Sequence, residues 1–122
     1  MILLKTRVNI IDNSGGRFGE VLNILCKSSK SSAVVGDVLV LTLKKITPNK
    51  KVEKGKIYKG IVVKLKKKIV RYGGIFIKFS DNGVILLNSK KAIIGTRVLS
   101  IVAQELKEIK CVKILSLAPS VF

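Results

Sequence analysis

The stretch from Gly36 to Arg71 constrains this chain most, because apolar runs and lysines alternate within it. Two β-like apolar runs, Val38–Leu43 and Ile57–Leu65, could each bury one side in a core. Lysines crowd the segments between and after these runs, where Glu53 is the only acid. A lone ammonium is too costly to bury, so these lysines must face solvent or an anion. Because the stretch holds so few carboxylates, it predicts an external, negatively charged partner.

The charge of the whole chain favours the same conclusion. Its 122 residues include 24 Lys or Arg against 7 Asp or Glu, which gives a net charge of +17. Solubility of a small domain needs only about 2–8 charges, so the excess favours a polyanion: nucleic acid, an acidic membrane surface or an acidic protein. The length predicts one domain over residues 1–122, and the 48% hydrophobic content is ample for an aliphatic core.

The residues that usually carry catalysis or bind metals are scarce. The chain has no His, which excludes histidine bases and histidine ligands. Cys26 and Cys111 lie outside any CxxC pair, so we expect no metal site. We interpret both as apolar core residues in a reducing compartment, with a single disulfide as the alternative. The acids form no close catalytic pair in the sequence, and Gly15-Gly16 matches no phosphate-loop pattern. We therefore expect neither an enzyme nor a cofactor.

Short strands separated by turn signals are expected over the first two-thirds of the chain. The near-continuous hydrophobicity of Val38–Leu43 predicts burial on both faces or closure of the sheet. Tyr72-Gly73-Gly74 predicts a hairpin turn, and Phe76 and Phe79 are expected in the core. The expected strands are Thr6–Ile11, Glu20–Lys27, Val38–Leu43, Ile57–Leu65, Ile75–Phe79 and Val84–Leu87.

The pattern changes near the C-terminus, over about residues 98–118. Within Val98–Lys107 the apolar residues Leu99, Val102, Ala103 and Leu106 recur at helical spacing. Cys111–Leu117 predicts one or two further helical turns before Pro119. Together these patterns predict a mainly β fold, a small β-barrel with helical decoration at the C-terminus.

Aromatic residues are few, and this bears on the kind of nucleic acid. A platform that stacks single-stranded bases normally needs more exposed rings than this region offers. We therefore expect folded or double-stranded RNA, contacted through its backbone. A free RNA chaperone or translation-factor-like barrel is the alternative, and it requires exposed rings at Tyr58, Tyr72 or the phenylalanines. A membrane-surface protein would need a basic amphipathic helix, which the sequence lacks; no apolar run is long enough to span a bilayer either.

Several short motifs carry a resemblance that covers essentially the whole chain. They include Asp12-Asn13-Ser14-Gly15, Val35-Gly36-Asp37, Leu86-Leu87-Asn88, Gly95-Thr96-Arg97 and Ser116-Leu117-Ala118-Pro119. With these motifs in one register, the sequence resembles the universal large-subunit ribosomal protein family fourteen in its bacterial and organellar form. The resemblance implies a five-stranded β-barrel with an extra β-ribbon and short C-terminal helices.

The same resemblance implies a structural role in the ribosome. The partners would be large-subunit rRNA, small-subunit rRNA across an intersubunit bridge, neighbouring proteins of families three and nineteen, and a ribosome-silencing factor. The resemblance assigns an RNA-facing loop with Lys44, Lys45, Asn49, Lys50, Lys51 and Lys54. It assigns Thr96, Arg97 and Lys113 to the subunit interface. The lysine-rich stretch adds further RNA-binding candidates, Lys64, Lys66, Lys67, Lys68 and Arg71.

This chain departs from the family's usual pattern at several of those positions. Lys64-Leu65 stands where Arg-Thr is usual, and Asn49-Lys50 stands where Arg-Gly is common. A lysine is a point charge, so bidentate phosphate contacts of arginine would be lost. The abundance of Lys and Ile and the scarcity of Ala suit an AT-rich coding sequence. This bias favours a mitochondrial or plastid ribosome, with the bacterial cytoplasm as the alternative.

Overall fold

The computed structural model describes residues 2–25, 31–48, 51–109 and 111–122. The described residues form a series of β-strands followed by two short helices. The helices are the 3₁₀ helix η1 (Gln104–Lys107) and the α-helix α1 (Val112–Leu117). The strands are β1 (Arg7–Ile10), β2 (Gly16–Ile24), β3 (Val38–Ile46), β4 (Ile57–Lys64), β5 (Ile69–Arg71), β6 (Ile75–Ile77) and β7 (Gly83–Leu87).

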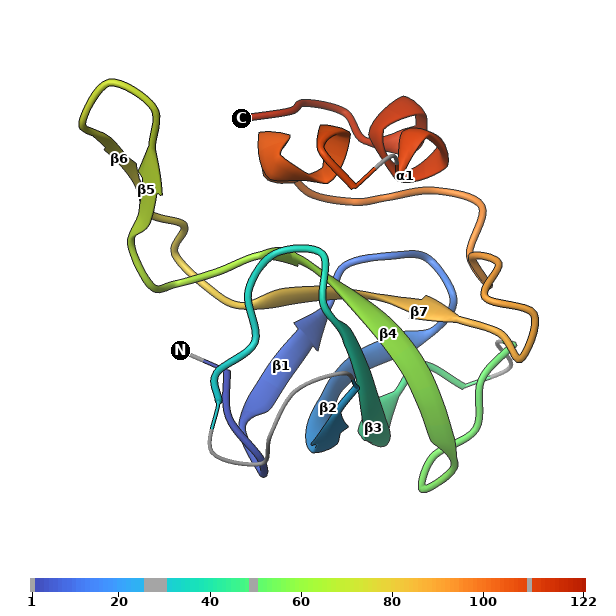
Figure 1. The fold of residues 1–122 in the computed structure, drawn as a ribbon. Coiled ribbons are helices and arrows are strands. Elements are labelled where there is room, and N and C mark those ends of the chain that lie inside the picture. The colour runs from blue at the N-terminus through green and yellow to red at the C-terminus, as the bar shows by residue number, and fades with distance from the viewer. Residues whose placement is uncertain (1, 26–30, 49–50, 110) are drawn as a thin grey trace.

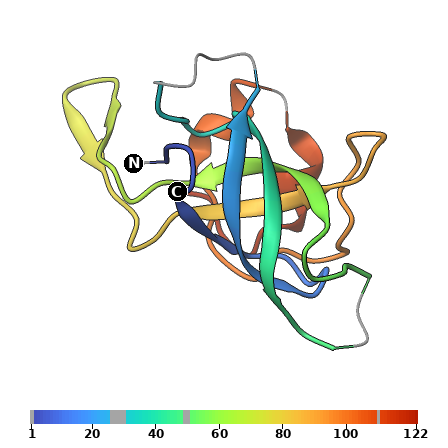
Figure 2. The ribbon, with the colours of Figure 1, turned by 90° about the horizontal axis from the view of Figure 1, so that it is seen from below.

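Five strands close into a barrel in the order β1-β2-β3-β4-β7 (Figures 1 and 2). Neighbouring strands are antiparallel except β1 and β7, which run parallel with Asn9 opposite Gly83. The strands β5 and β6 form a separate two-stranded ribbon that projects from the barrel (Figure 1). The predicted fold class, a mainly β five-stranded barrel with an extra ribbon and short C-terminal helices, is confirmed.

The barrel interior is filled by aliphatic side chains from all five strands. On β3 the alternation is regular, because Leu39, Leu41 and Leu43 are fully buried and the residues between them are half-buried. Closure of the sheet therefore explains the apolar run on β3. Val8, Val21, Val62, Val84 and Leu86 complete this core from the other strands.

All of β7 and residues 60–64 of β4 are buried on both faces. Ile61 and Val63 of β4 and Ile85 of β7 point away from the barrel interior, into a second apolar cluster. The other side of that cluster comes from the C-terminal region, through Val98, Val102, Leu106 and Ile114. The C-terminal segment thus forms a layer over one side of the barrel (Figure 1).

Helical structure over Val98–Lys107 was predicted too broadly, because only Gln104–Lys107 is helical. The segment before η1 is extended, since its backbone groups bond to distant parts of the chain. The N–H of Leu99 donates to the carbonyl oxygen of Ile11 at 2.7 Å, and that of Ala103 to Val63 at 2.8 Å. Leu99 is exposed as a result, whereas Val102, Ala103 and Leu106 are buried. The predicted helix within Cys111–Leu117 is confirmed as α1.

Two further expectations on apolar residues need correction. Phe76 is 60% exposed on the ribbon, although a core position was expected, and Phe79 is half-buried. Cys111 is a free, half-buried thiol at the edge of the second cluster, so it is not a fully buried core residue. Burial raises the pKa of this thiol. Cys26 lies outside the described residues.

No helix among the described residues has the length and apolar character that crossing a membrane would require.

The two-sided burial of β4 generates a first prediction. Val63 has no exposed surface and lies between the barrel and the C-terminal layer. The substitution Val63→Asp should cost about 4 kcal/mol or more, because an unpaired carboxylate would enter an apolar cluster. Thermal unfolding should show a loss of the cooperative transition. The control Ile57→Asp, on the 66% exposed start of the same strand, should keep it; equal melting temperatures for Val63→Asp and the unmodified protein would contradict the assignment.

Candidate nucleic-acid interface

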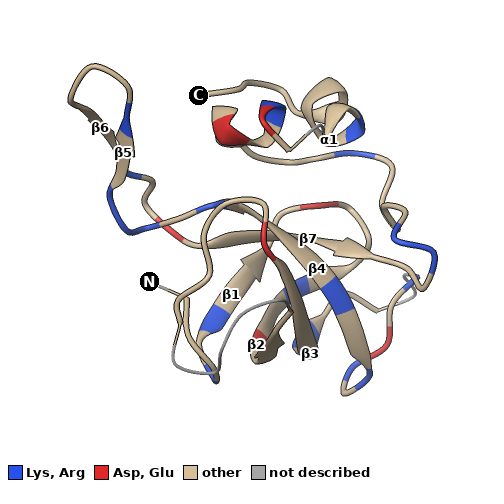
Figure 3. Ribbon diagram, in the orientation of Figure 1, with Lys and Arg blue, Asp and Glu red and all other residues tan. Residues whose placement is uncertain are grey.

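The predicted RNA-binding lysines occupy two separate surfaces, one beyond each end of β4. The first, called here the β3–β4 loop surface, contains the exposed Lys44, Lys45, Lys51 and Lys54. The second, called here the ribbon base, contains the exposed Lys66, Lys67 and Lys68. Figure 3, which colours Lys and Arg blue on the ribbon, shows blue segments beyond both ends of β4. Asn49 and Lys50, which complete the predicted loop, lie outside the described residues.

The described part of the β3–β4 loop is fixed to the barrel at several points. Val52 is 2% exposed and packs in the barrel core. The N–H of Gly55 donates to the carbonyl oxygen of Leu43 at 3.0 Å, and the N–H of Glu53 donates to the hydroxyl of Tyr58 at 3.0 Å. The ammonium groups of this surface therefore project from a held backbone, which lowers the entropy lost when they bind phosphates.

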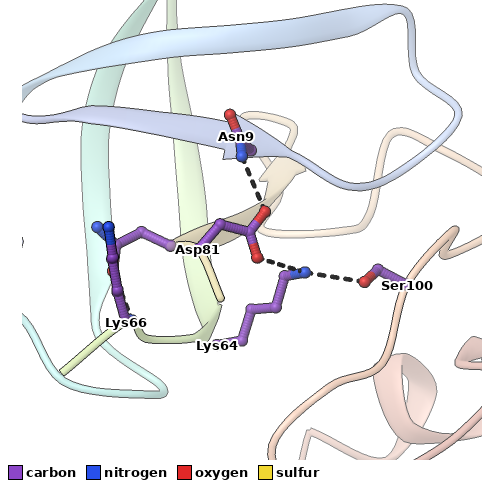
Figure 4. Close-up of polar contacts among 6 residues, drawn as sticks. Asn9, Lys64, Lys66, Asp81 and Ser100 are labelled. Atoms are coloured by element: carbon purple, nitrogen blue, oxygen red, sulfur yellow. Dashed lines mark hydrogen bonds and ion pairs between the residues drawn. The ribbon is translucent and has the colours of Figure 1, made fainter. Parts of the chain in front are cut away.

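Lys64 differs from the other candidates because it is buried and paired. Its ammonium lies 2.7 Å from Oδ1 of Asp81 and donates to the hydroxyl of Ser100 at 2.9 Å (Figure 4). Asn9 donates to the other carboxylate oxygen of Asp81 at 2.8 Å. The cluster ties β4 to β1 and to the segment before η1. The expectation that carboxylates are too few to pair these cations internally is wrong for Lys64, because Asp81 comes from outside the lysine-rich stretch.

The pKa of Asp81 reflects this pairing. Burial by itself would raise that pKa, but the hydrogen bonds from Lys64 and Asn9 and the charge of Lys64 lower it below its usual value. Asp81 is therefore ionised at neutral pH and holds the ammonium in place.

Arg71 also has internal partners. Its guanidinium forms a two-point ion pair with Glu105, with Nε to Oε1 at 2.6 Å and Nη2 to Oε2 at 3.1 Å, and Nη2 also donates to the carbonyl oxygen of Phe122. Burial would raise the pKa of Glu105, but the contact with Arg71 lowers it overall. These contacts fasten the ribbon to η1 and to the C-terminal segment.

Two motifs far apart in the sequence meet beside the barrel. The side-chain oxygen of Asn13 accepts hydrogen bonds from the N–H groups of Thr96 at 2.8 Å and Arg97 at 3.0 Å, and its amide nitrogen donates to the Thr96 hydroxyl at 2.8 Å. A Cβ at Gly95 would lie 2.7 Å from that oxygen, so the close approach requires glycine. Thr96 and Arg97 are exposed on this fixed turn.

The turn that presents Asn13 is itself held by Asp12. The buried carboxylate accepts hydrogen bonds from the N–H and hydroxyl of Ser14 at 3.2 and 2.5 Å, and from the N–H of Leu86 at 3.2 Å. Burial raises the pKa of Asp12, and these hydrogen bonds offset the shift only in part. The turn predicted from this motif is thus confirmed, with side-chain-to-backbone bonds as the cause.

Lys113 lies apart from that turn, exposed on α1. It lines a cavity of about 190 Å³ together with Lys91, Ile93, Cys111 and Ile114. No hydrogen bond joins Lys113 to Thr96 or Arg97 among the described residues. The predicted interface residues therefore lie in two parts of the chain: Thr96 and Arg97 in the irregular segment that follows β7, and Lys113 on α1.

Comparison with known families gives a direct result. The model of one family, described as ribosomal protein L14p/L23e, matches residues 1–122, the whole chain. The chain belongs to the L14p/L23e family. It is therefore of a structural class of ribosomal constituents that bind rRNA, which agrees with the barrel and with the excess of exposed lysines.

Several features of this L14p/L23e protein were not predicted from the sequence. Asp81 was interpreted only as a turn residue, and no pattern linked it to Lys64. The pair Arg71–Glu105 joins residues 34 positions apart, which no local spacing reveals. The scarcity of acids could have pointed to these pairs, because each of the few carboxylates is a candidate partner for a buried cation.

The Lys64–Asp81 pair generates a second prediction. Asp81→Asn should destabilise this protein by about 1–2 kcal/mol at pH 7, since Lys64, with 9% of its side chain exposed, would lose its counter-charge. The pKa of Asp81 is lower in the folded state than its usual 3.8. The stabilisation is therefore complete above about pH 5 and is lost as pH falls through the folded-state pKa.

Urea unfolding at pH 7 and pH 3 would measure this effect. The difference between Asp81→Asn and the unmodified protein should shrink at pH 3. Glu53→Gln is a matched control, because Glu53 pairs with Lys56 at 2.9 Å on the exposed loop and should contribute little. Equal stability losses for Asp81→Asn at both pH values would contradict the electrostatic explanation.

Proposed function

We propose that this L14p/L23e-family protein binds large-subunit rRNA through the β3–β4 loop surface and the ribbon base. The proposal comprises Lys44, Lys45, Asn49, Lys50, Lys51, Lys54, Lys66, Lys67 and Lys68. It is supported by one observation above all: the described lysines of both surfaces are exposed, and none forms an ion pair with a described carboxylate. Lys64 and Arg71 are left out, because their partners within the fold already neutralise them.

The chemistry of this contact is that of point charges against phosphate oxygens. Lysine provides a compact charge with three donors, and each neutralised phosphate releases condensed counterions. The affinity would thus depend strongly on salt and weakly on base sequence. The same proposal includes a bridge to small-subunit rRNA, formed by the β3–β4 loop on the side that faces the other subunit.

Removing three loop lysines tests the proposal. The substitution of Lys50, Lys51 and Lys54 by Ala should lower the slope of log affinity against log salt by about 2–3, because about 0.9 counterions are released per duplex phosphate contact. Fluorescence anisotropy with a large-subunit rRNA fragment at several salt concentrations would measure it.

A variant of equal charge loss serves as the control. Substituting Lys59, Lys90 and Lys107, which lie outside both surfaces, should change the slope much less. If the slope of log affinity against log salt falls by the same amount in both triple variants, RNA contact at this loop is disproved. The affinity would then depend only on the net charge of the protein.

We further propose that Thr96, Arg97 and Lys113 form part of the subunit interface. Two observations support this role: all three residues are exposed, and the backbone of Thr96 and Arg97 is held by hydrogen bonds to the side chain of Asn13. The same surface would receive a ribosome-silencing factor, and ribosomal proteins of families three and nineteen would be its neighbours in the large subunit. The lysine-rich, isoleucine-rich composition favours an organellar ribosome over a bacterial one.

Subunit joining provides the test of this interface. Large subunits that carry Arg97→Ala with Lys113→Ala should join small subunits severalfold less tightly, as measured by light scattering, while incorporation of the protein stays normal. Lys107→Ala, an exposed lysine on η1, is the control. Normal joining by the double variant would remove these residues from the interface.

A further inference from the structure

The ribbon formed by β5 and β6 has two unlike faces. The pairs Ile69–Ile77, Val70–Phe76 and Arg71–Ile75 lie opposite each other across its two strands. Side chains alternate between faces along a strand, so Val70 and Phe76 share one face, while the other two pairs share the opposite face. The first is called here the outer face. The opposite face is the anchored one, because Ile69 packs against the barrel core and Arg71 pairs with Glu105.

The outer face combines apolar surface with positive charge. Val70 is 70% exposed and Phe76 is 60% exposed, and Tyr72 at the tip is completely exposed. The ammonium of Lys68 lies 5.4 Å from the centre of the Phe76 ring, which places it on the same face. Continuing the alternation beyond β6 puts the exposed Lys78 there as well.

The tip of the ribbon keeps Tyr72 in solvent. The turn is a three-residue loop, Tyr72-Gly73-Gly74, in which both glycines have positive φ, +86° and +76°. This backbone suits glycine and leaves the tyrosine as the only side chain on the turn. The ribbon projects clear of the barrel in both views (Figures 1 and 2).

We propose that the outer face is a stacking platform for unpaired RNA bases, with Phe76 and Tyr72 as the rings and Lys68 and Lys78 as phosphate contacts. This inference rests on the proposed rRNA binding and deepens it, since it adds a single-stranded contact to the backbone contacts of the lysine surfaces. Exposed rings flanked by cations are the arrangement that binds single strands, because every base has a flat apolar face beside a phosphate.

Charge favours RNA over an apolar protein strand as the occupant. The residues on the outer face include two lysines and no acid, and Lys66 and Lys67 continue the positive charge at the ribbon base. Val70 and Tyr72 also line a groove with Glu105 and Glu108, but Glu105 is already paired with Arg71, and Lys107 lines the same groove. A protein partner of that kind would leave these ammonium groups without phosphates to neutralise them.

Replacing the rings without removing apolar character tests the platform. In the double variant Tyr72→Leu with Phe76→Leu, the Kd for a single-stranded oligoadenylate should rise about tenfold or more, because each ring loses a stacked base. Its affinity for inorganic polyphosphate, which has no bases, should stay unchanged. Because the chain has no Trp, tyrosine emission also reports binding directly: oligoadenylate should quench it in the unmodified protein, and less so in the double variant.

Phe18→Leu is the matched control. Phe18 also carries a cation over its ring, with the Arg7 guanidinium 4.1 Å from the ring centre, but it lies on the barrel strand β2. Its loss should leave oligoadenylate affinity unchanged. Both leucine variants are expected to unfold at the temperature of the unmodified protein or close to it, and circular dichroism would verify this.

The outcomes separate this inference from the proposed function. Unchanged oligoadenylate affinity in the double variant, or an equal loss for polyphosphate, would overturn the platform. If in that case the lysine-loop variant still loses its salt slope, rRNA binding stands without the platform. A double variant that keeps RNA affinity but loses contact with another large-subunit protein would make the outer face a protein interface, which also overturns the inference.

Discussion

Burial of β4 and β7 on both faces is the constraint on which the rest of this structure depends. Inward side chains such as Val62 fill the barrel, and outward ones such as Val63 and Ile85 carry the C-terminal layer. Each Å² of apolar surface removed from water contributes about 25 cal/mol to the stability of the fold. Because two strands bury side chains on both faces, this small aliphatic chain gains a second core. The same packing holds in place the segment after β7 that contains Thr96 and Arg97, and the helix α1 that contains Lys113. The positions of the candidate interface residues therefore depend on this second apolar cluster.

Carboxylates then decide which cations belong to the fold and which remain for a partner. Asp81 and Glu105 neutralise Lys64 and Arg71 at points where the chain must join separate elements. With 7 acids against 24 bases, most cations have no such partner available. Clusters of them lie beyond the two ends of β4, and others are spread over the rest of the molecule (Figure 3). Self-repulsion of these groups lowers the stability of the free protein, and a phosphate-rich partner relieves it.

The barrel could be predicted well from the sequence, because local alternation of apolar and polar residues and the turn residues between them mark its strands. It predicted contacts between distant segments poorly. Asn13 and Thr96 were both singled out, yet nothing local revealed that one amide holds the other residue in place. Lys64 looked like any other lysine until the fold brought Asp81 to it. Phe76 was misjudged because a three-residue apolar strand resembles core, whereas here it belongs to a ribbon that leaves the barrel.

The parallel pairing of β1 with β7 has a consequence for how the chain acquires its shape. The strand that seals the barrel is its last, with Asn9 opposite Gly83, so the ring of hydrogen bonds stays open while everything before Gly83 is being synthesised. Loop-closure entropy makes such a distant pairing slow. During that interval the nascent chain exposes aliphatic strands and many ammonium groups at once, and exposed apolar strands are prone to aggregate. The barrel can therefore reach its native topology only after β7 has been synthesised, whatever the local propensity of the earlier strands.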